Sequence, residues 1–457
     1  MQEQPSESLQ RITLTMVLLN AFTTPLMLSG VNVALPAIAI DLSMNAVLLS
    51  WIPMAYLMAS AMFVLIFGRL ADMVGRKRIF LIGTGSVIVT SLIAAFAVSG
   101  TMLVAARFLQ GMSAAMLYAT QVAIVSSVFP PAKRGRAIGL TVSTIYLGLT
   151  IGPLLGGFVI DAFGWRASFL LHIPLAFVVL LLGVFYVKGD WSSDERGSFD
   201  LFGALTYIVS ILIICIAVSY LPSTLSLFLL ALSLFGFAFF FLFEKVHKHP
   251  IFNVTLFFTN RIFTFSCLAS LIIYTATFAN VVQVSLYLQY LKEMSAASAG
   301  MIMMCQPLTM AIFSPLAGRL SDKIEARYLA TAGMAVSCGG LLLLSNLQVD
   351  SSLDYLLGAL VITGFGFSLF SSPNVNAIMG SVEKRSLGSA NGVMATMRIF
   401  GQMTSMVLVT LVFALIIGPV EIDVSNYDAL EKAIRLTFSI AACLCLPGLY
   451  FSVARGK

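Results

Sequence analysis

The polar side chains that could bind a ligand or move a proton are few, and they lie inside long apolar runs. In one of these runs, five residues recur at a helical spacing: Arg107, Gln110, Gly111, Tyr118 and Gln121. They share one face of a helix with about 3.6 residues per turn. Because an arginine in lipid is costly unless it meets water, carbonyls or a partner, this face is expected to line an aqueous cavity. The alternative is that Arg107 lies near a helix end and reaches the lipid headgroups.

Two further polar faces are predicted in the second half of the chain. One consists of Asn280, Gln283 and Tyr287, and the other of Asn391, Arg398, Gln402 and Ser405. If these two faces lie opposite the face that carries Arg107, which we call the Arg107 stripe, the three would enclose a central chamber with two arginines, neutral amides and aromatic surface. Such a chamber suits an anionic or neutral amphiphile better than a cation. The alternative is that these polar groups only form hydrogen bonds with one another between neighbouring helices.

Proton coupling needs a group whose protonation can change, and the apolar runs offer few. Arginine stays charged under accessible conditions, so Arg107 and Arg398 could assist coupling without titrating. His172 is the other group in these runs that is suited to titration near neutral pH, either as a proton relay or as a histidine satisfied by loop carbonyls. No carboxylate is expected at the midplane, because the nearest acids lie at or beyond the ends of the runs: Asp41, Asp72, Asp161, Glu244, Glu293 and Asp322.

The elements that position these residues are predicted to be membrane-spanning helices. Hydrophobic residues make up 59% of 457 and charged residues 10%, so lipid is the expected solvent. A bilayer core needs about 20 apolar residues per helix, and the runs are continuous rather than alternating, which favours helices over a barrel. Fourteen spans are expected, at residues 12–38, 46–67, 79–98, 102–127, 137–160, 167–187, 201–220, 225–243, 262–290, 296–317, 328–347, 355–378, 387–417 and 434–453.

The distribution of Lys and Arg predicts the topology. With the amino terminus inside, most of the 26 basic residues fall in loops on the same side. The positive-inside rule assigns that side to the cytoplasm. A multi-pass protein of the cell membrane with both termini in the cytoplasm is therefore expected. Leu221-Pro222-Ser223-Thr224 divides the long run at 201–243 into a hairpin.

An internal repeat divides the remaining helices into related halves. Gly68-Arg69-Leu70-Ala71-Asp72 recurs as Gly318-Arg319-Leu320-Ser321-Asp322, each time at the end of an apolar run. The expected fold is an all-α integral membrane protein with two six-helix bundles related by pseudo-symmetry and an inserted two-helix hairpin. The predicted boundaries are 1–187 for the N-terminal bundle, 188–261 for the linker with the hairpin, and 262–457 for the C-terminal bundle.

A loop signature follows the second span. Gly68-x-Leu70-x-Asp72-x-x-Gly75-Arg76-Lys77-Arg78 combines a small residue, an acid at a helix end, a turn glycine and a basic cluster. It resembles the signature between helices 2 and 3 of the major facilitator superfamily. Asp72 can accept hydrogen bonds from a helix amino terminus or pair with an arginine, which would latch the cytoplasmic side; alternatively, the basic cluster only sets the topology. The predicted cytoplasmic gate consists of Gly68, Asp72, Gly75, Arg76 and Asp322.

The fifth span carries a glycine pattern, Gly148-x-x-x-Gly152-Pro153-x-x-Gly156-Gly157. Glycines four residues apart form a groove that admits another helix closely, and Pro153 removes a backbone donor and bends the helix. The pattern is similar to the antiporter motif of exporters in the same superfamily, where the bend is associated with extrusion. By itself, the small-residue spacing would indicate only close helix packing.

Further motifs resemble the fourteen-helix drug:proton antiporter branch of this superfamily. Arg107-Phe108-Leu109-Gln110-Gly111 is similar to its helix 4 motif, in which the arginine is associated with proton coupling. Gly164-Trp165-Arg166-x-x-Phe169 and Val33-Ala34-Leu35-Pro36 resemble segments of helices 6 and 1. Related exporters often carry an aspartate in helix 1, and that position here is Met27. A lipophilic cation would therefore lack the usual counter-charge.

The resemblance implies a secondary active exporter of amphiphilic drugs or toxic compounds that works by alternating access, with proton antiport. The alternative is a uniporter or exchanger of organic anions or lipids with the same fold. The substrate cavity is assigned to Met27, Gln110, Tyr118, Gln121, Asn280, Gln283, Tyr287 and Gln402. Coupling is assigned to Arg107, Arg398 and His172.

Other classes of function are disfavoured by what the chain contains. It has no P-loop, His-Glu-x-x-His or Gly-x-Ser-x-Gly pattern, so an enzyme is not expected. Its six cysteines fall in predicted spans and are expected to be free thiols, with no metal site and no cofactor. Dispersed basic residues disfavour nucleic-acid binding. The expected partners are a small amphiphile, protons and membrane lipid, and the chain is expected to be a monomer.

Overall fold

The computed structural model describes residues 6–191, 199–220, 223–247, 251–252, 254–321, 323–382 and 387–456. Within these ranges the protein is helical and has no named β-strand, and 14 helical stretches are long and apolar enough to cross a membrane. Their order and positions confirm the predicted spans and the all-α membrane fold. The predicted gate residue Asp322 and the turn residues Leu221 and Pro222 lie outside the described residues.

Seven helical segments form the first six spans. They are α1 Glu7–Asp41, α2 Ala46–Val74, α3 Arg76–Ala95, α4 Gly100–Val128, α5 Pro131–Phe163, α6 Trp165–Leu170 and α7 Ile173–Leu181. The sixth span combines α6, α7 and a π-helical turn at Leu182–Tyr186, and His172 lies at the break between α6 and α7.

The hairpin and the second half follow in the same order as predicted. The hairpin is α8 Leu201–Ser219 and α9 Thr224–Val246, and a short α10 Val254–Thr259 follows it. The later helices are α11 Arg261–Thr277, α12 Asn280–Leu286 with a π-helical turn at Tyr287–Leu291, α13 Ala296–Met303, α14 Cys305–Leu320, α15 Ala326–Leu344, α16 Leu353–Gly380, α17 Leu387–Ile416 and α18 Tyr427–Ala454. The ninth span is α11, α12 and the second π-helical turn, and the tenth is α13 with α14.

Capping side chains explain why many helices begin outside the apolar runs. A side-chain oxygen accepts a hydrogen bond from a first-turn amide at Ser6, Asn45, Ser99, Asp200, Ser223, Asn260, Ser295 and Ser352. These caps satisfy amides that the helix itself leaves unpaired. The largest extension is at α18, which begins at Tyr427 although its apolar run was predicted from 434. Helical hydrogen bonding therefore continues through the polar turn before the lipid-exposed stretch.

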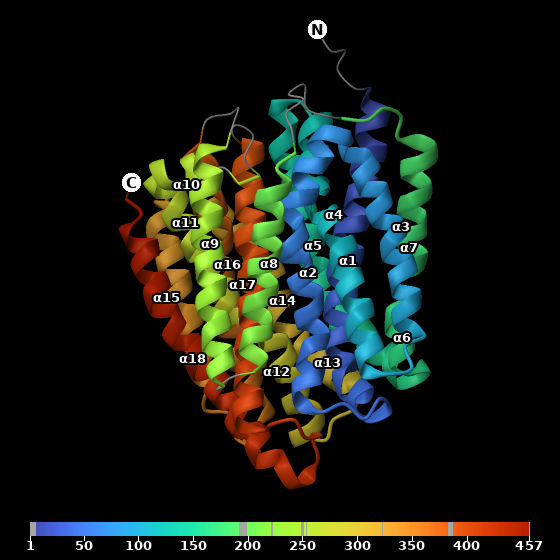
Figure 1. Cartoon of the computed structure of the whole chain (residues 1–457), viewed down its shortest axis with the longest axis vertical. Helices are drawn as coiled ribbons and strands as arrows, with labels where there is room; N and C mark the ends of the chain where they lie inside the picture. The colour runs from blue at the N-terminus through green and yellow to red at the C-terminus, as the bar shows by residue number, and fades with distance from the viewer. Residues whose placement is uncertain are drawn as a thin grey trace.

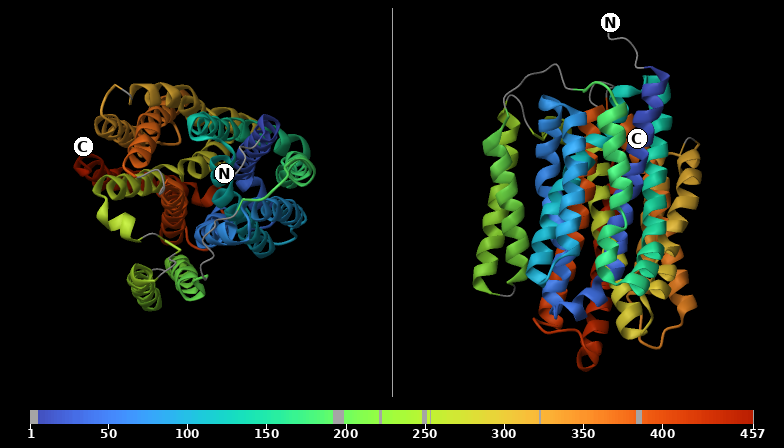
Figure 2. Two further views of the ribbon diagram at one scale, coloured as in Figure 1. Left: turned by 90° about the horizontal axis from the view of Figure 1, so that it is seen from above. Right: turned by 90° about the vertical axis from the view of Figure 1, so that its right-hand side faces the viewer.

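The helices form two packed groups with the hairpin at the edge. In the first group α1 packs on α5, and α4 lies between α2 and α3; in the second, α16 packs on α14 and α15, and α11 on α17 and α18. The pair α8 and α9 stands outside both groups in the view from above (Figure 2). We call the groups the first bundle (α1–α7) and the second bundle (α11–α18).

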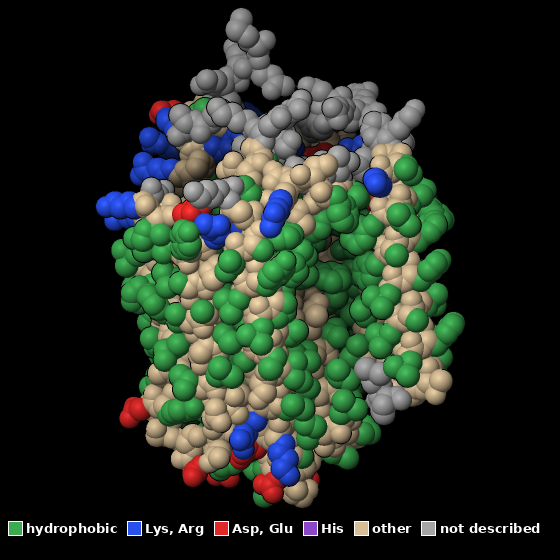
Figure 3. All heavy atoms as spheres, turned by 90° about the vertical axis from the view of Figure 1, so that its left-hand side faces the viewer, with side chains coloured by type: hydrophobic (Ala, Val, Ile, Leu, Met, Phe, Trp, Pro, Cys, Tyr) green, Lys and Arg blue, Asp and Glu red, His purple; other side chains and the backbone are tan. Residues whose placement is uncertain are grey.

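Both chain termini lie at the same end of the molecule (Figure 1). We call this end the terminal side and the opposite end the far side. Lys and Arg side chains gather on the terminal side, and a belt of hydrophobic side chains separates them from the charges on the far side (Figure 3). Such a belt is the surface expected in contact with a bilayer.

Candidate functional site

One polar cluster joins the two bundles about midway along their helices. Arg398 of α17 is half-buried and interacts electrostatically with Tyr118 of α4, Tyr146 of α5 and Tyr274 of α11. The Tyr274 hydroxyl also lies within hydrogen-bonding reach of the Arg398 guanidinium. The Tyr146 hydroxyl is 3.1 Å from Ser371 Oγ of α16. We call Arg398, Tyr118, Tyr146 and Tyr274 the arginine–tyrosine cluster.

The chemistry of this cluster favours acceptor-rich aromatic compounds. A guanidinium donates only, whereas tyrosine offers a ring face and a hydroxyl that donates or accepts. None of the ion pairs in the described part of the chain includes Arg398. Its charge is therefore not matched by a described carboxylate, and it is available to a carbonyl or anionic group of a ligand.

A second polar chain runs through the interior of the first bundle. Arg107 is fully buried; its Nη1 donates to Gln110 Oε1 and its Nε donates to the carbonyl of Ile52 at 3.3 Å. Gln110 Nε2 donates to Ser91 Oγ at 2.7 Å, and this hydroxyl lies 2.9 Å from His172 Nε2. Three helices thus contribute to one connected set of hydrogen bonds that ends at His172.

Tyr56 connects this polar chain to the arginine–tyrosine cluster. The Arg107 guanidinium lies 4.4 Å from the centre of the Tyr56 ring, a cation–π contact. The Tyr56 hydroxyl is 3.1 Å from the Tyr118 hydroxyl, and Tyr118 interacts with Arg398. Contacts therefore extend from His172 inside the first bundle to Tyr118, which lies within electrostatic range of Arg398 between the bundles. All three predicted coupling residues belong to this path.

The predicted stripe on α4 faces several neighbouring helices instead of one chamber. Gln121 accepts a hydrogen bond from Asn20 Nδ2 of α1 at 3.2 Å, and Gln110 is bonded to α3. A Cβ at Gly111 would lie 2.1 Å from the carbonyl oxygen of Tyr56, so α2 covers this part of the stripe. Of the stripe, Tyr118 is the residue placed beside Arg398. The face spans enough of the helix for α1, α2 and α3 each to contact part of it.

The other predicted cavity residues are distributed over three places. Met27 and His172 line a small cavity inside the first bundle, together with Asn20, Thr23, Thr24, Thr84, Val87, Leu117 and Ala176. Tyr287 donates to the carbonyl of Gln348 at 2.7 Å on the far side. Asn280 and Gln283 are buried, and within the described ranges their amide groups have no hydrogen-bond partner; Gln402 is half-buried.

Sequence reasoning missed several residues of the central site. Tyr56, Tyr146 and Tyr274 supply its rings and hydroxyls, and Ser91 joins Gln110 to His172. Each lies within an apolar run, and no amide or charged residue stands three or four positions away to mark its face. A tyrosine near the middle of a span is the signal that could have identified three of them.

The glycine pattern of α5 forms two different contacts. Gly148, Gly152 and Gly156 face α1, where added Cβ atoms would lie 2.5 Å from the Phe22 carbonyl oxygen, 1.9 Å from Ser29 Oγ and 2.8 Å from the Gly30 Cα. Gly157 instead faces α13 of the second bundle, at 2.3 Å from the Ala296 carbonyl oxygen. Pro153 takes part in the same crossing, because a Cβ at Gly300 would lie 2.1 Å from its carbonyl oxygen.

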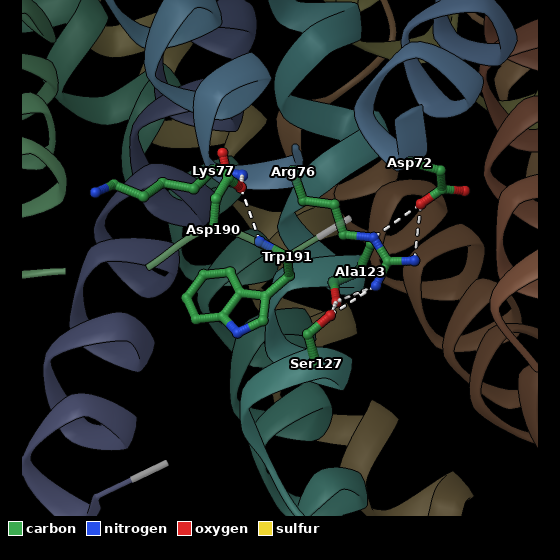
Figure 4. A network of polar contacts seen from close by, with 7 residues as sticks. All are labelled: Asp72, Arg76, Lys77, Ala123, Ser127, Asp190 and Trp191. Carbon is green, nitrogen blue, oxygen red and sulfur yellow. Dashed lines mark hydrogen bonds and ion pairs between the residues drawn. The ribbon is translucent and has the colours of Figure 1, made fainter. Parts of the chain in front are cut away.

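The predicted gate signature forms a hydrogen-bonded network on the terminal side (Figure 4). Arg76 pairs with Asp72 at 2.8 Å, and its Nη1 donates to Ser127 Oγ of α4 at 2.6 Å and to the Ala123 carbonyl at 3.4 Å. Gly75 has a φ of +126°, a conformation that favours glycine, and it separates α2 from α3. Gly68 faces Ala119 of α4, where an added Cβ would be in ordinary contact.

Two residues absent from the predicted gate complete the network. Asp190 Oδ1 accepts from the backbone amide of Lys77 at 2.8 Å, and the Trp191 carbonyl accepts from the amide of Arg76 at 2.9 Å. Asp190 also pairs with Arg78 at 3.4 Å. The start of the linker is thereby attached to the amino terminus of α3.

Hydrogen bonds between the two bundles concentrate on the far side. The amide of Ala46 donates to the carbonyl of Val420 at 2.8 Å, and Gln289 Nε2 donates to the carbonyl of Val33 at 2.9 Å. Asp161 of α5 accepts from the amides of Ala296 and Ala297 at 3.2 and 2.9 Å, which caps α13 of the other bundle. The far side is closed by these contacts.

Comparisons with known proteins agree with the fold. The profile of the Major Facilitator Superfamily matches residues 17–259 and 266–456. The riboflavin transporter RibZ of Clostridioides difficile (strain 630) is 30% identical over 442 residues, covering 97% of this chain and 96% of that protein. The multidrug resistance protein Stp of Mycobacterium tuberculosis (strain CDC 1551 / Oshkosh) is 32% identical over 377 residues, covering 81% of this chain and 70% of Stp.

A solved structure supports the same architecture. A POT family transporter in complex with 5-aminolevulinic acid superimposes with a TM-score of 0.73 at 15% identity, covering 97% of this chain and 96% of that one. The family match, the 14 apolar helices and the relatives covering nearly the whole chain are consistent with one another. The chain therefore belongs to the major facilitator superfamily, and the protein is a multi-pass membrane transporter.

Proposed function

We propose that this protein is a secondary active exporter of small amphiphilic compounds that works by alternating access with proton antiport. The arginine–tyrosine cluster carries this proposal, because residues of both bundles meet there around an arginine without a described carboxylate partner. A site built from both bundles changes its exposure when the bundles rock against each other.

The contacts at the far side support an alternating mechanism. Among the described residues, hydrogen bonds at Ala46, Val33 and Asp161 join the bundles there. The gate network on the terminal side is built, in its described part, from α2, α3, α4 and the start of the linker. Rocking would break the first set and leave the second intact, so the access of the substrate would alternate between the two sides.

The composition of the cluster favours a neutral or anionic aromatic substrate. Three tyrosine rings offer stacking surfaces, and Arg398 offers charge-assisted hydrogen bonds to a carbonyl or an anion. The names of the relatives are compatible with this class, since RibZ is named for riboflavin and Stp for multidrug resistance. The amphiphilic compound is thus expected to present a ring and acceptor groups.

The path from His172 to Arg398 supports proton coupling. His172 is the residue of that path whose side-chain type exchanges protons most readily, and in this proposal it is the proton-binding group. A proton at His172 would reorient Ser91 and Gln110, which hold Arg107 against Tyr56. In this proposal, the resulting displacement of Arg107 shifts Tyr56 and Tyr118 and so alters the surroundings of Arg398. Extrusion is favoured by the α5 glycine pattern, and the basic residues assign the terminal side to the cytoplasm of the cell.

A second candidate function is favoured by the same arginines. A uniporter or exchanger of organic anions would use Arg398 as the anion site and would need no titrating group. The two candidates differ in their response to a pH gradient. Exchange would persist without the gradient, whereas antiport would lose its driving force.

Transport by purified protein in proteoliposomes tests both candidates. The initial rates of riboflavin and of a panel of amphiphilic aromatic drugs are measured for wild type, Arg398→Ala and Arg398→Lys, with and without a protonophore. Losing a hydrogen bond to a charged group costs about 1.5–3 kcal/mol, so Arg398→Ala is expected to reduce transport about tenfold or more. Lys432→Ala is the control, because Lys432 is exposed on the far side.

Each result has a distinct meaning for the proposal. Loss of transport in Arg398→Ala with collapse by the protonophore supports a proton antiporter that uses the cluster. Full transport after the gradient is dissipated favours the exchanger. Wild-type rates in Arg398→Ala for every transported compound would show that the substrate binds elsewhere.

A further inference from the structure

Two buried acids face each other in the inserted hairpin. Asp200 caps the start of α8, and Glu244 lies near the end of α9; their exposed fractions are 4% and 1%. Both lie at the terminal side of a hairpin that stands outside the two bundles (Figure 2). This pair is separate from the arginine–tyrosine cluster.

Each acid uses one oxygen for a backbone hydrogen bond, and its other oxygen has no hydrogen-bond partner among the described residues. Asp200 Oδ1 accepts from the amide of Gly203 at 2.9 Å, and Glu244 Oε2 accepts from the amide of Phe252 at 3.2 Å. The oxygens without a described partner are Asp200 Oδ2 and Glu244 Oε1, and both are buried. A buried oxygen without a donor is destabilising, more so when it is charged.

The two unpartnered oxygens converge on one point. A Cβ built on Gly203 would lie 2.4 Å from Asp200 Oδ2 and 2.6 Å from Glu244 Oε1, so both oxygens lie against the same glycine. The two side chains are within hydrogen-bonding reach of each other. Glycine at this position leaves the space in which the carboxyl groups approach.

Few basic groups of the described chain lie near the two carboxylates. In the described part of the chain, the basic nitrogen within 4.0 Å of Asp200 is His247 Nδ1, at 3.8 Å from Oδ2, and no ion pair involves Glu244. Lys245, next to Glu244 on α9, is exposed. From α2, which packs on α8, the contact is the Ala61 carbonyl, which accepts from the Tyr207 hydroxyl. Two negative charges on these neighbouring buried carboxylates would repel each other. Binding of one proton to the pair removes the repulsion.

We propose that Asp200 and Glu244 form a proton-binding site in which the two carboxyl groups share one proton. The protonated Glu244 donates from Oε1 to Asp200 Oδ2, and both acids keep their backbone hydrogen bonds to Gly203 and Phe252. The shared proton joins the start of α8 to the end of α9 and to the segment that leads into α10. Loss of the proton would leave two adjacent carboxylates and loosen this junction.

Infrared spectroscopy of the full-length protein in lipid nanodiscs tests the site. The carbonyl stretch of a protonated carboxylic acid is recorded at pH 7 for wild type, Asp200→Asn and Glu244→Gln. Both variants keep an amide that donates to the remaining carboxylate, so the junction is preserved while the shared proton is removed. Wild type is expected to show the band and each variant to lose it. Asp354→Asn, at an exposed acid of α16, is the control and keeps the band.

The pH dependence of melting provides a second measurement, and its wild-type result does not require either variant to fold. Because the folded pair holds its proton more tightly than unfolded acids do, its stabilisation is present at low pH and is lost as pH rises through the titration of the folded pair. Wild-type melting temperature is expected to fall by a few degrees over that range, and that of Glu244→Gln to stay level.

Two outcomes would overturn the proposal. The first is a wild-type spectrum at pH 7 that matches the Asp200→Asn/Glu244→Gln double variant, since no carboxylic acid would then be present at this site. The second is loss of the band on adding sodium or magnesium chloride at constant pH, which would assign the site to a metal cation instead of a proton.

Discussion

The two ends of this transporter are held together in different ways. On the far side, the contacts cross between the bundles and many use backbone groups, as at Ala46 with Val420 and at Asp161 with the α13 amides. On the terminal side, the described gate network ties α2 and α3 to α4 and to the start of the linker. In the proposed alternating mechanism, the first set would break when the bundles rock, whereas the second would move as a rigid unit. The far side would then be the closed gate.

Overpacking the crossing of α5 and α13 is expected to have the largest effect on this gate. In Gly300→Val, the new Cβ would lie 2.1 Å from the Pro153 carbonyl oxygen, so the bundles could not close. Overpacking costs about 1–3 kcal/mol, and we expect a loss of transport of about tenfold or more. Far-side labelling of a cysteine at position 33 by an impermeant reagent should increase. Gly339→Val, with open space around the added Cβ, is the control. Unchanged labelling in Gly300→Val would refute this role of the crossing.

Removing the cap that α5 provides to α13 is expected to have the next largest effect. Asp161→Ala leaves the amides of Ala296 and Ala297 without their acceptor. Losing a helix cap costs about 1 kcal/mol, so the closed state should be disfavoured about fivefold. The same cysteine labelling measures this shift. Asp423→Ala removes a cap that lies within the second bundle, and an equal shift in that variant would argue against a specific role of the crossing between bundles.

Breaking the terminal-side network should lower the transport rate without increasing far-side labelling. Arg76→Ala removes the pair with Asp72 and the bond to Ser127, both within the first bundle. Partly exposed ion pairs contribute about 1 kcal/mol or less, so transport should fall by about two- to fivefold and far-side labelling should not change. Arg136→Ala, at an exposed arginine of α5 outside the described network, is the control. A labelling increase like that of Gly300→Val would remove the distinction between the two ends.

The smallest effect is expected for the hydroxyl pair between α2 and α17. Ser50 Oγ lies 2.8 Å from Thr410 Oγ1, and Thr410 also donates to the carbonyl of Met406. Since Thr410 keeps that second partner, Ser50→Ala should change transport by about twofold at most. A loss as large as that of Asp161→Ala would mean that side-chain contacts contribute as much to far-side closure as the backbone contacts do.

The helices were predictable because their cause is local and repeated. Apolar runs of sufficient length and the charges between them are enough to place fourteen spans, since lipid requires every backbone group to be bonded within its own helix. The glycine spacing of α5 likewise predicts close packing, although three of its glycines contact α1 and Gly157 contacts α13. The break at His172 and the π-helical turns were not predicted, because neither changes the hydropathy of the run.

The site was predicted less completely than the fold. Arg107, Arg398, Tyr118 and the gate pair of Asp72 and Arg76 are visible as polar groups or as a motif. Their neighbours are not, since Asp190 reaches the gate from more than one hundred residues away and Tyr274 reaches Arg398 from another helix.

The order of residues along the chain is sufficient to predict a bundle of fourteen membrane helices, because hydrophobic length and backbone hydrogen bonding depend only on residues close together in the chain. Which polar groups meet was decided by the tertiary structure. The face of α4 that carries Arg107 and Tyr118 is one stripe by spacing, but α2 and α3 surround Arg107 while Tyr118 lies beside Arg398. Helical periodicity gives the direction of a side chain, and only the packing of other helices supplies the partner.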